Sequence, residues 1–142
     1  MKRFLFSLQR ELDLRIYRED EAEVELGKAM GILQKIQNRL ESLAQERCRA
    51  ASERFASGNS AMDMLSCERY IKRLDAEKEE LLEEAAKAEL IVAEKRGAYI
   101  EASRQRQALG KVREKRFREY RKLSLREETK TLDDISAGRT FR

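Results

Sequence analysis

The chain has 142 residues, of which 41% are Asp, Glu, Lys or Arg, and it contains no proline, histidine or tryptophan. Because proline inside a helix costs about 3 kcal/mol, its absence permits helices of unusual length. The 31 basic and 27 acidic residues leave a net charge of only +4, which disfavours a chain held open by self-repulsion. Aromatic residues make up 6%, too few for a thick globular core. The composition therefore indicates a single domain over residues 1–142, built as a long helix or coiled coil.

The start of the chain and its two cysteines bear on where the protein works. Residues 1–6 begin basic and apolar, but charge returns at Arg10 and Glu11, so no signal-peptide core follows. No apolar run approaches the roughly 18 residues that a membrane span needs. We therefore expect a cytoplasmic protein in which Cys48 and Cys67 are free thiols. Neither cysteine sits in a metal-ligand cluster, so no metal or cofactor is predicted.

Apolar residues recur at alternating steps of three and four in the first part of the chain. This period of 3.5 residues keeps one stripe on the same side of a helix, as in a left-handed coiled coil. The stripe is weak between Arg15 and Glu19, where we expect Ile16 to supply the contact from a neighbouring position. The register predicts a first helix over about residues 3–56, and its positions are Leu5, Leu8, Leu12, Arg15, Glu19, Ala22, Leu26, Ala29, Leu33, Ile36, Leu40, Leu43, Arg47, Ala50 and Arg54.

The first register stops at a cluster of turn residues, Ser57-Gly58-Asn59-Ser60. Gly58 and Asn59 can adopt the left-handed conformation that ends a helix. Ser60 followed by Asp63 resembles a capping box, with Asp in place of the usual Glu. These signals predict a turn at residues 57–60 and a second helix that begins near residue 61.

A second heptad register follows the turn and predicts a helix over about residues 61–128. It is regular as far as Ala102, beyond which Val112 and Phe117 indicate a phase shift or a weaker seam. Thr129 and Thr131 should loosen the helix, so we expect residues 129–142 to form a frayed tail. The positions of this register are Cys67, Ile71, Leu74, Lys78, Leu81, Ala85, Ala88, Val92, Lys95, Tyr99, Ala102, Arg106, Leu109, Arg113, Arg116, Tyr120 and Leu123.

Two long amphipathic helices joined by a short turn pack antiparallel. Folding the chain about the turn places Leu43 opposite Leu74, and Leu12 close to Gln105. The predicted fold is therefore all-α, a long antiparallel two-helix coiled-coil hairpin. Its apolar seam is regular near the turn and weakens toward the end that carries both termini.

The sequence contains no constellation of residues that points to catalysis. No histidine is available as a base at neutral pH, and Gly27-x-x-x-Gly31 lacks the Lys-Ser/Thr of a phosphate-binding loop. Carboxylates such as Glu79 and Glu83 are bracketed by lysines, which is typical of a solvated helix face. Two paired helices also offer no cleft in which a pKa is strongly shifted. We therefore predict a non-enzymatic protein without a small-molecule substrate.

Charge is unevenly spread along the second predicted helix. Residues 75–89 are mainly acidic, whereas residues 104–126 are strongly basic and include Phe117 and Tyr120. Some of the arginines fall on the seam itself, which weakens self-packing and favours a protein interface. The alternatives are a merely solvated basic end, a helix that holds nucleic-acid phosphates, and a purely structural coiled coil that pairs in parallel. The modest net charge and the lack of a recognised nucleic-acid module disfavour nucleic acid.

The first fifteen residues carry the most specific pattern in the chain. A basic pair precedes Phe4-Leu5-Phe6-Ser7-Leu8-Gln9, which leads into Leu12-Asp13-Leu14-Arg15 and then an acidic, alanine-containing helix. This opening resembles the FliJ family of bacterial flagellar export proteins. The length, the hairpin and the basic C-terminal helix agree with that family over the whole chain, although other coiled coils share them.

The resemblance implies a cytoplasmic component of the flagellar type III export apparatus, peripheral at the cytoplasmic face of the inner membrane. FliJ-like proteins resemble the central stalk of rotary ATPases: they insert the end carrying both termini into the hexameric ring of the export ATPase FliI and promote its assembly. They also contact the export gate protein FlhA and export chaperones, through a surface whose residues the resemblance does not assign here. By position, the ring-inserted end comprises Phe4, Phe6, Leu8, Gln9, Arg113, Arg116, Phe117, Arg118 and Tyr120.

Overall fold

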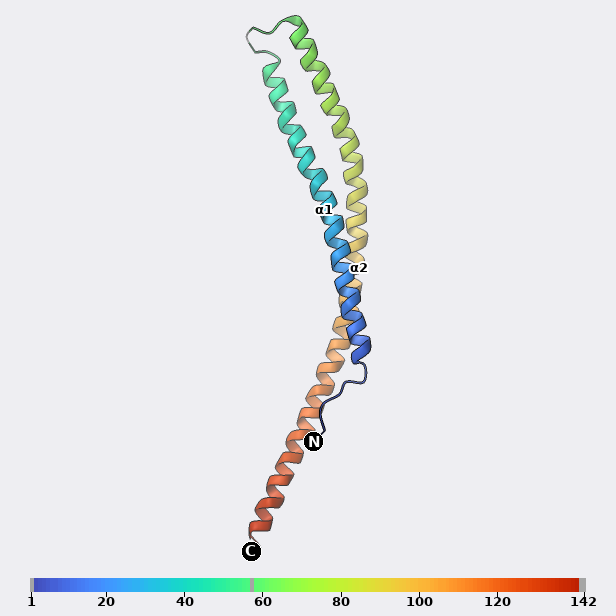
Figure 1. The fold of residues 1–142 in the computed structure, drawn as a ribbon, viewed down its shortest axis with the longest axis vertical. Helices are drawn as coiled ribbons and strands as arrows, with labels where there is room; N and C mark the ends of the chain where they lie inside the picture. The colour runs from blue at the N-terminus through green and yellow to red at the C-terminus, as the bar shows by residue number, and fades with distance from the viewer. Residues whose placement is uncertain (1, 57, 141–142) are drawn as a thin grey trace. The chain divides into compact units, whose positions relative to one another are not determined.

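The computed structural model describes residues 2–56 and 58–140, in which two long helices pack against each other (Figure 1). Helix α1 spans Gln9–Glu53 and helix α2 spans Ala61–Thr140, and no strand occurs in this described part. The predicted all-α helical hairpin is therefore confirmed. The chain divides into two compact units, which we call the turn unit (Ala22–Tyr99) and the terminal unit (Met1–Glu21 with Ile100–Arg142).

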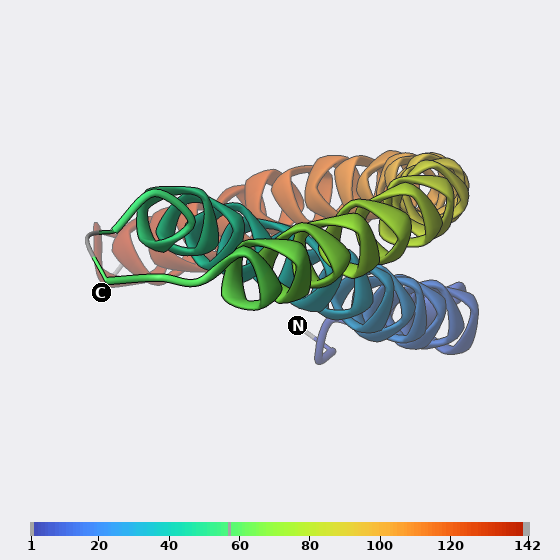
Figure 2. The ribbon, with the colours of Figure 1, turned by 90° about the horizontal axis from the view of Figure 1, so that it is seen from above.

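In the turn unit, α1 and α2 run side by side (Figures 1 and 2). The side chains that they bury between them are apolar. Leu43 is 2% exposed and Leu74 is 5% exposed, and the two line the same hollow between the helices, as their predicted pairing requires. Every buried residue of this unit occupies a position of the two predicted registers. These residues are Ala29, Leu43, Ala50, Leu74, Ala85, Ala88 and Val92.

Arginines of α1 reach across the seam of the turn unit to carboxylates of α2. The Arg39 guanidinium donates from two nitrogens to the Glu77 carboxylate, at 2.9 and 3.1 Å. Each of these side chains is partly exposed, so each pair contributes no more than about 1 kcal/mol. Because the pairs occur at fixed positions, they favour the antiparallel register over shifted ones. The cross-helix pairs are Arg39–Glu77, Arg47–Asp75 and Arg54–Glu68.

The turn ends α1 at Glu53, earlier than the predicted residue 56. Gly58 has a φ of 94°, the left-handed conformation predicted for it, whereas Asn59 has no positive φ. Instead, the Asn59 side-chain amide donates to the Glu53 carbonyl at 2.7 Å, and the Ala56 N–H donates to the same carbonyl at 3.1 Å. These bonds satisfy a terminal carbonyl of α1 and close the turn around it. Ser57, part of the predicted turn, lies outside the described residues.

Helix α2 begins at Ala61 because Ser60 and Asp63 form the predicted capping box. The Asp63 N–H donates to the Ser60 hydroxyl at 3.2 Å, and the Ser60 N–H donates to the Asp63 carboxylate at 3.0 Å. Two N–H groups that helical geometry leaves without partners are thereby satisfied. The hydrogen bonds from Ser60 hold the pKa of the Asp63 carboxyl below its ordinary value.

In the terminal unit, α1 begins at Gln9, so the prediction of a helix from residue 3 was wrong. The Gln9 N–H donates to the Phe6 carbonyl at 3.1 Å, which opens the first turn. Ahead of it, residues 2–6 are not helical, and exposure alternates from Phe4 to Phe6, as it does where residues two apart face the same side. Phe4 and Phe6 can therefore both face α2, whereas Leu5 between them is 85% exposed. A helix over these residues would have placed the two rings on opposite sides.

The weak stretch of the first register is bridged by polar contacts. Ile16, which we expected to supply the contact, is 39% exposed and is not part of the buried cluster. The Arg15 guanidinium donates to the Gln105 carbonyl at 2.8 Å, and Glu19 forms an ion pair with Arg106. Leu12 belongs to one buried cluster with Leu109, about one turn further along α2 than its predicted neighbour Gln105.

Helix α2 continues to Thr140, so the predicted end at residue 128 and the frayed tail were wrong for the residues up to that point. The Thr129 hydroxyl donates to the Leu125 carbonyl and the Thr131 hydroxyl to the Glu127 carbonyl, both at 2.9 Å. Threonine hydroxyls that bond one turn back are compatible with a helix, and no proline interrupts it. Residues 141–142 of the predicted tail lie outside the described residues.

Ser60→Ala should lower the free energy of unfolding by about 1 kcal/mol, because it removes the hydroxyl that caps α2. Urea denaturation followed by circular dichroism at 222 nm measures this difference. The control is Ser66→Ala, an exposed serine one turn inside the same helix, where alanine is at least as favourable. Equal losses in the two variants would show that the capping box does not stabilise the chain.

Asp63→Asn should remove only the charge of the cap, and its effect should depend on pH. Because folding lowers the pKa of Asp63, its ionised form stabilises the fold above the unfolded pKa of about 3.9. That contribution disappears as the pH falls through the still lower pKa of the folded state. The variant should therefore unfold at lower urea than the parent at pH 7, and the gap should close below about pH 4. A gap of constant size from pH 7 to pH 2 would contradict this.

Candidate functional site

An N-terminal strap, residues 2–8, lies against α2 in the terminal unit (Figure 1). Its Phe4 ring meets the Phe117 ring edge-on at 5.2 Å between centroids and lies 5.4 Å from the Tyr120 ring. Phe117 and Tyr120 are stacked on each other at 6.4 Å. Aromatic contacts of this kind stabilise by about 0.5–1.5 kcal/mol each beyond the area that they bury. The three rings thus form one cluster that joins the strap to α2.

Beside the rings, the strap contributes to a small buried core. Phe6 is 8% exposed, and Leu12 and Leu109 are 7% exposed, with Phe4 packed against the cluster. Burial of a phenylalanine contributes about 1.5–3 kcal/mol, which is a large share for a strap of so few residues. Phe6 is therefore a main anchor of the strap.

Polar contacts fix the strap to α2 at two further points, Lys2 and Ser7, and the start of α1 at Gln9. The Tyr120 hydroxyl donates to the Lys2 carbonyl at 2.7 Å. The Arg116 guanidinium donates to the Ser7 hydroxyl at 2.9 Å, and the Arg113 guanidinium donates to the Gln9 side-chain oxygen at 3.1 Å.

The same two arginines stand over aromatic rings of the strap. Arg113 lies 5.9 Å from the centroid of the Phe4 ring, and Arg116 lies 5.6 Å from the centroid of the Phe6 ring. Cation–π contacts at partly exposed sites contribute about 0.5–1 kcal/mol. Arg113, Arg116 and Tyr120 are positions of the second predicted register, so that register continues here, with an extended chain in place of a helix as its partner.

The structure brings most of the predicted site residues together but leaves two aside. Leu8 is 39% exposed at the end of the strap. The Arg118 side chain is 75% exposed and pairs only with Glu114 on its own helix, at 3.6 Å. The residues that converge are Phe4, Phe6, Gln9, Arg113, Arg116, Phe117 and Tyr120.

Sequence reasoning did not separate the basic stretch into two faces. Lys111, Lys115, Arg118 and Lys122 recur at steps of four, three and four, and all four are exposed. Each lies two residues from a register position, which is about 200° around the helix, so the stripe faces away from the strap. We call it the cationic stripe. A helical wheel drawn from the second register would have shown it.

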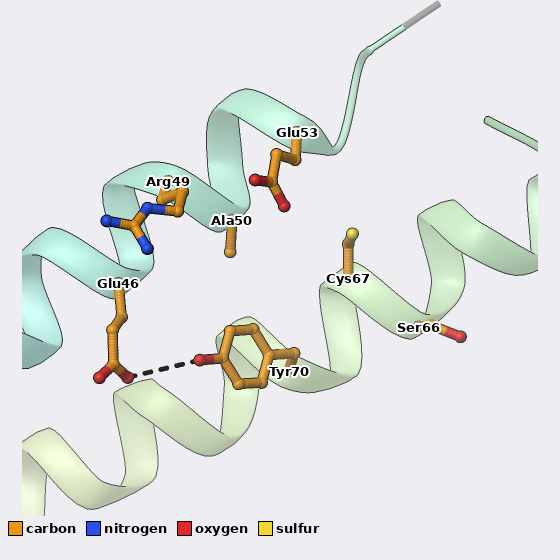
Figure 3. A pocket seen from close by; sticks show the side chains of 7 residues that line it. All are labelled: Glu46, Arg49, Ala50, Glu53, Ser66, Cys67 and Tyr70. Carbon is orange, nitrogen blue, oxygen red and sulfur yellow. Dashed lines mark hydrogen bonds between the residues drawn. The ribbon is translucent and has the colours of Figure 1, made fainter. Parts of the chain in front are cut away.

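A shallow hollow of about 330 Å³ lies between the helices near the turn (Figure 3). It forms where two small residues, Ala50 and Cys67, face each other across the seam. The Tyr70 hydroxyl donates to the Glu46 carboxylate at 3.4 Å along its edge. No group of three metal-ligating side chains occurs among the described residues, and both cysteines are free thiols. The hollow therefore offers no arrangement for metal chemistry.

In the part of the chain that the structure describes, neither helix has an apolar stretch long enough to cross a membrane. Residues 4–142 match the family described as Flagellar FliJ protein. Searches of the curated proteins and of the solved structures gave no match.

Phe6→Ala should release the strap without unfolding the turn unit. The lost burial of about 1.5–3 kcal/mol corresponds to a roughly ten- to hundredfold larger fraction of opened strap. Trypsin should then cleave after Arg10 correspondingly faster, as measured by intact mass at early times. Leu5→Ala is the matched control, because its side chain is 85% exposed in the same strap. An unchanged cleavage rate in Phe6→Ala would contradict the anchoring role of Phe6.

Proposed function

The chain belongs to the flagellar FliJ family, and from this premise we propose that it acts as a non-enzymatic stalk and escort protein of flagellar export. Membership makes it a component of the flagellar protein export apparatus. In the proposed function, the end that carries both termini inserts into the hexameric ring of the export ATPase FliI and promotes assembly of that ring. The chain also contacts the export gate protein FlhA and export chaperones, and it works in the cytoplasm at the inner face of the membrane.

The cationic stripe is the observation that supports insertion most directly. Lys111, Lys115, Arg118 and Lys122 are exposed on the face of α2 that the strap leaves free. A basic surface is attracted to an acidic one and is repelled by a basic one, so an acidic ring interior would select this face. The ring gains stability from any ligand that binds only the assembled form. A protein without catalytic groups can therefore raise the ATPase rate by raising the hexamer fraction.

The strap supports the same proposal in a different way. Phe6 is buried, and Phe4, Phe117 and Tyr120 pack on one another, so these rings hold the end of the hairpin together. Gln9 bonds to Arg113 and thereby fixes the start of α1 on α2. Leu8 is 39% exposed, Phe117 is 42% exposed and the Arg118 side chain is 75% exposed, so these three predicted site residues can touch the ring directly. We assign the ring contact to them and to the cationic stripe.

Reversing three charges of the stripe, with Lys115→Glu, Arg118→Glu and Lys122→Glu combined, should weaken stimulation of a cognate export ATPase. Each lost attraction at a rim position contributes about 0.2–1 kcal/mol, so the three together should raise the protein needed for half-maximal stimulation by on the order of tenfold. The measurement is ATP hydrolysis by purified ATPase as a function of added chain, together with the hexamer fraction by sedimentation velocity.

The matched control reverses three exposed lysines of the turn unit, Lys28, Lys35 and Lys72, and should stimulate like the parent chain. Helicity by circular dichroism checks that both triple variants fold. If the stripe variant stimulates as well as the control, the insertion proposal fails. Micromolar binding of the parent chain to duplex or single-stranded nucleic acid, with a steep salt dependence that the stripe variant loses, would favour the nucleic-acid alternative.

A further inference from the structure

Helix α2 carries a second apolar face in the turn unit, which α1 does not cover. Ala86, Leu90, Ala93 and Gly97 follow one another at steps of four, three and four, the spacing of a coiled-coil seam. All four are exposed, and Leu90 is 72% exposed. The side chains that α2 buries against α1 here are those of Ala85, Ala88 and Val92. Leu90 stands two residues from both Ala88 and Val92, about 200° around the helix, so it points away from α1.

Gly97, like the other helical glycines, has room for a Cβ within the chain. Its φ is not positive, and a Cβ added to it would meet nothing within 4 Å. Glycine in a helix interior is less favourable than alanine, and its usual compensation is the close approach of another backbone. Together with Ala86 and Ala93, it would let a second helix approach to the lower end of the usual 8–10 Å range.

Four charged residues line this face, and their order is self-complementary. Lys87 and Glu94 lie along one edge, seven residues apart, and Glu89 and Arg96 lie along the other. All four side chains are exposed, and within the described residues none of them forms an ion pair. By contrast, Arg39 of the covered seam already holds its carboxylate partner, Glu77.

We propose that a second copy of this chain docks on this face of α2, antiparallel, through Ala86, Leu90, Ala93 and Gly97. In an antiparallel pair, each edge meets the same edge of the other copy. With Leu90 of each copy against Ala93 of the other, Lys87 faces Glu94 and Glu89 faces Arg96. Each of these pairs occurs twice across the two-fold axis, and all are attractive.

A parallel arrangement is disfavoured by the same charges. There, opposite edges meet, and Glu89 of one copy would face Glu94 of the other, which is repulsive. The charges therefore favour a second copy of the chain as the partner, and they favour its antiparallel arrangement over the parallel one. The seam runs over residues 86–97, about 18 Å of helix, so the contact is small and transient. It shares no residue with the strap or the cationic stripe and does not depend on the proposed function.

Sedimentation equilibrium of the full chain, under reducing conditions from about 10 μM to 1 mM, tests the proposal. The average mass should rise from that of one chain toward that of two, with a dissociation constant on the order of 100 μM. Leu90→Glu should keep the chain monomeric throughout this range. Ile32→Glu is the matched control, on α1 in the same unit at 58% exposure, and should associate like the parent. A monomeric parent at 1 mM, or a Leu90→Glu variant that still associates, would overturn the proposal.

Charge exchange then tests the direction of the pairing. Glu94→Lys places two lysines opposite each other, and Lys87→Glu places two glutamates there, so each single change should weaken association by about tenfold or more. The double variant Lys87→Glu with Glu94→Lys restores attraction and should associate like the parent. Stronger association of Glu94→Lys alone would indicate a parallel seam and overturn the antiparallel one, and so would a double variant that stays monomeric.

Discussion

Two paired helices can bury side chains only along the strip where they touch, and in this chain that strip is narrow. Leu43, at 2%, is the least exposed of the buried side chains, and several other buried positions are alanines such as Ala29 and Ala85. No polar or charged residue is buried in the described part of the chain. Because the strip needs only every third or fourth residue, the rest of the sequence is free to be charged, which explains how a chain with 41% charged residues still folds.

Where this strip lacks apolar residues, polar contacts and aromatic rings hold the segments together instead. Arg15 and the Glu19–Arg106 pair bridge the helices at partly covered positions. The Arg106 side chain is 36% exposed and the Glu19 side chain 13%, and each charge lies beside its opposite. At the end with both termini, the aromatic strap replaces the missing helix turn. Packed against leucine, the guanidinium groups of Arg113 and Arg116 would lack hydrogen-bond partners. Here they lie over aromatic rings and donate hydrogen bonds to polar side chains. Along the chain the seam thus changes from apolar contacts to polar and aromatic ones, while the heptad positions of α2 that form it continue.

A component of the flagellar export apparatus built this way meets its partners at its exposed faces. The buried Phe6 cannot also touch a partner, so its contribution to any interface is to hold the strap in place. The cationic stripe and the outer face of α2 in the turn unit differ in kind: one is a row of exposed cations, the other a short apolar seam with charges of both signs. The first suits a surface of opposite charge, and the second suits a copy of itself.

The sequence by itself determined the elements that depend on short-range physics. Heptad spacing specified which face of each helix is buried, down to Ala50 and Val92, and the capping box at Ser60 and Asp63 specified where α2 begins. The second register also contains Arg113, Arg116 and Tyr120 of the candidate site, whereas Phe4 and Phe6 entered it through the resemblance to the FliJ family.

Only the tertiary structure decided how the N-terminal residues pack. The spacing of Phe4 and Phe6 fits an extended chain, but that conformation is favoured only once Leu109, Phe117 and Tyr120 are present to receive the rings. The meeting of Leu12 with Leu109, and not with the predicted Gln105, is likewise a contact that the residue types alone do not fix. Local propensity acts within a few residues of the chain, whereas these contacts join segments about a hundred residues apart, so packing and not propensity determines them.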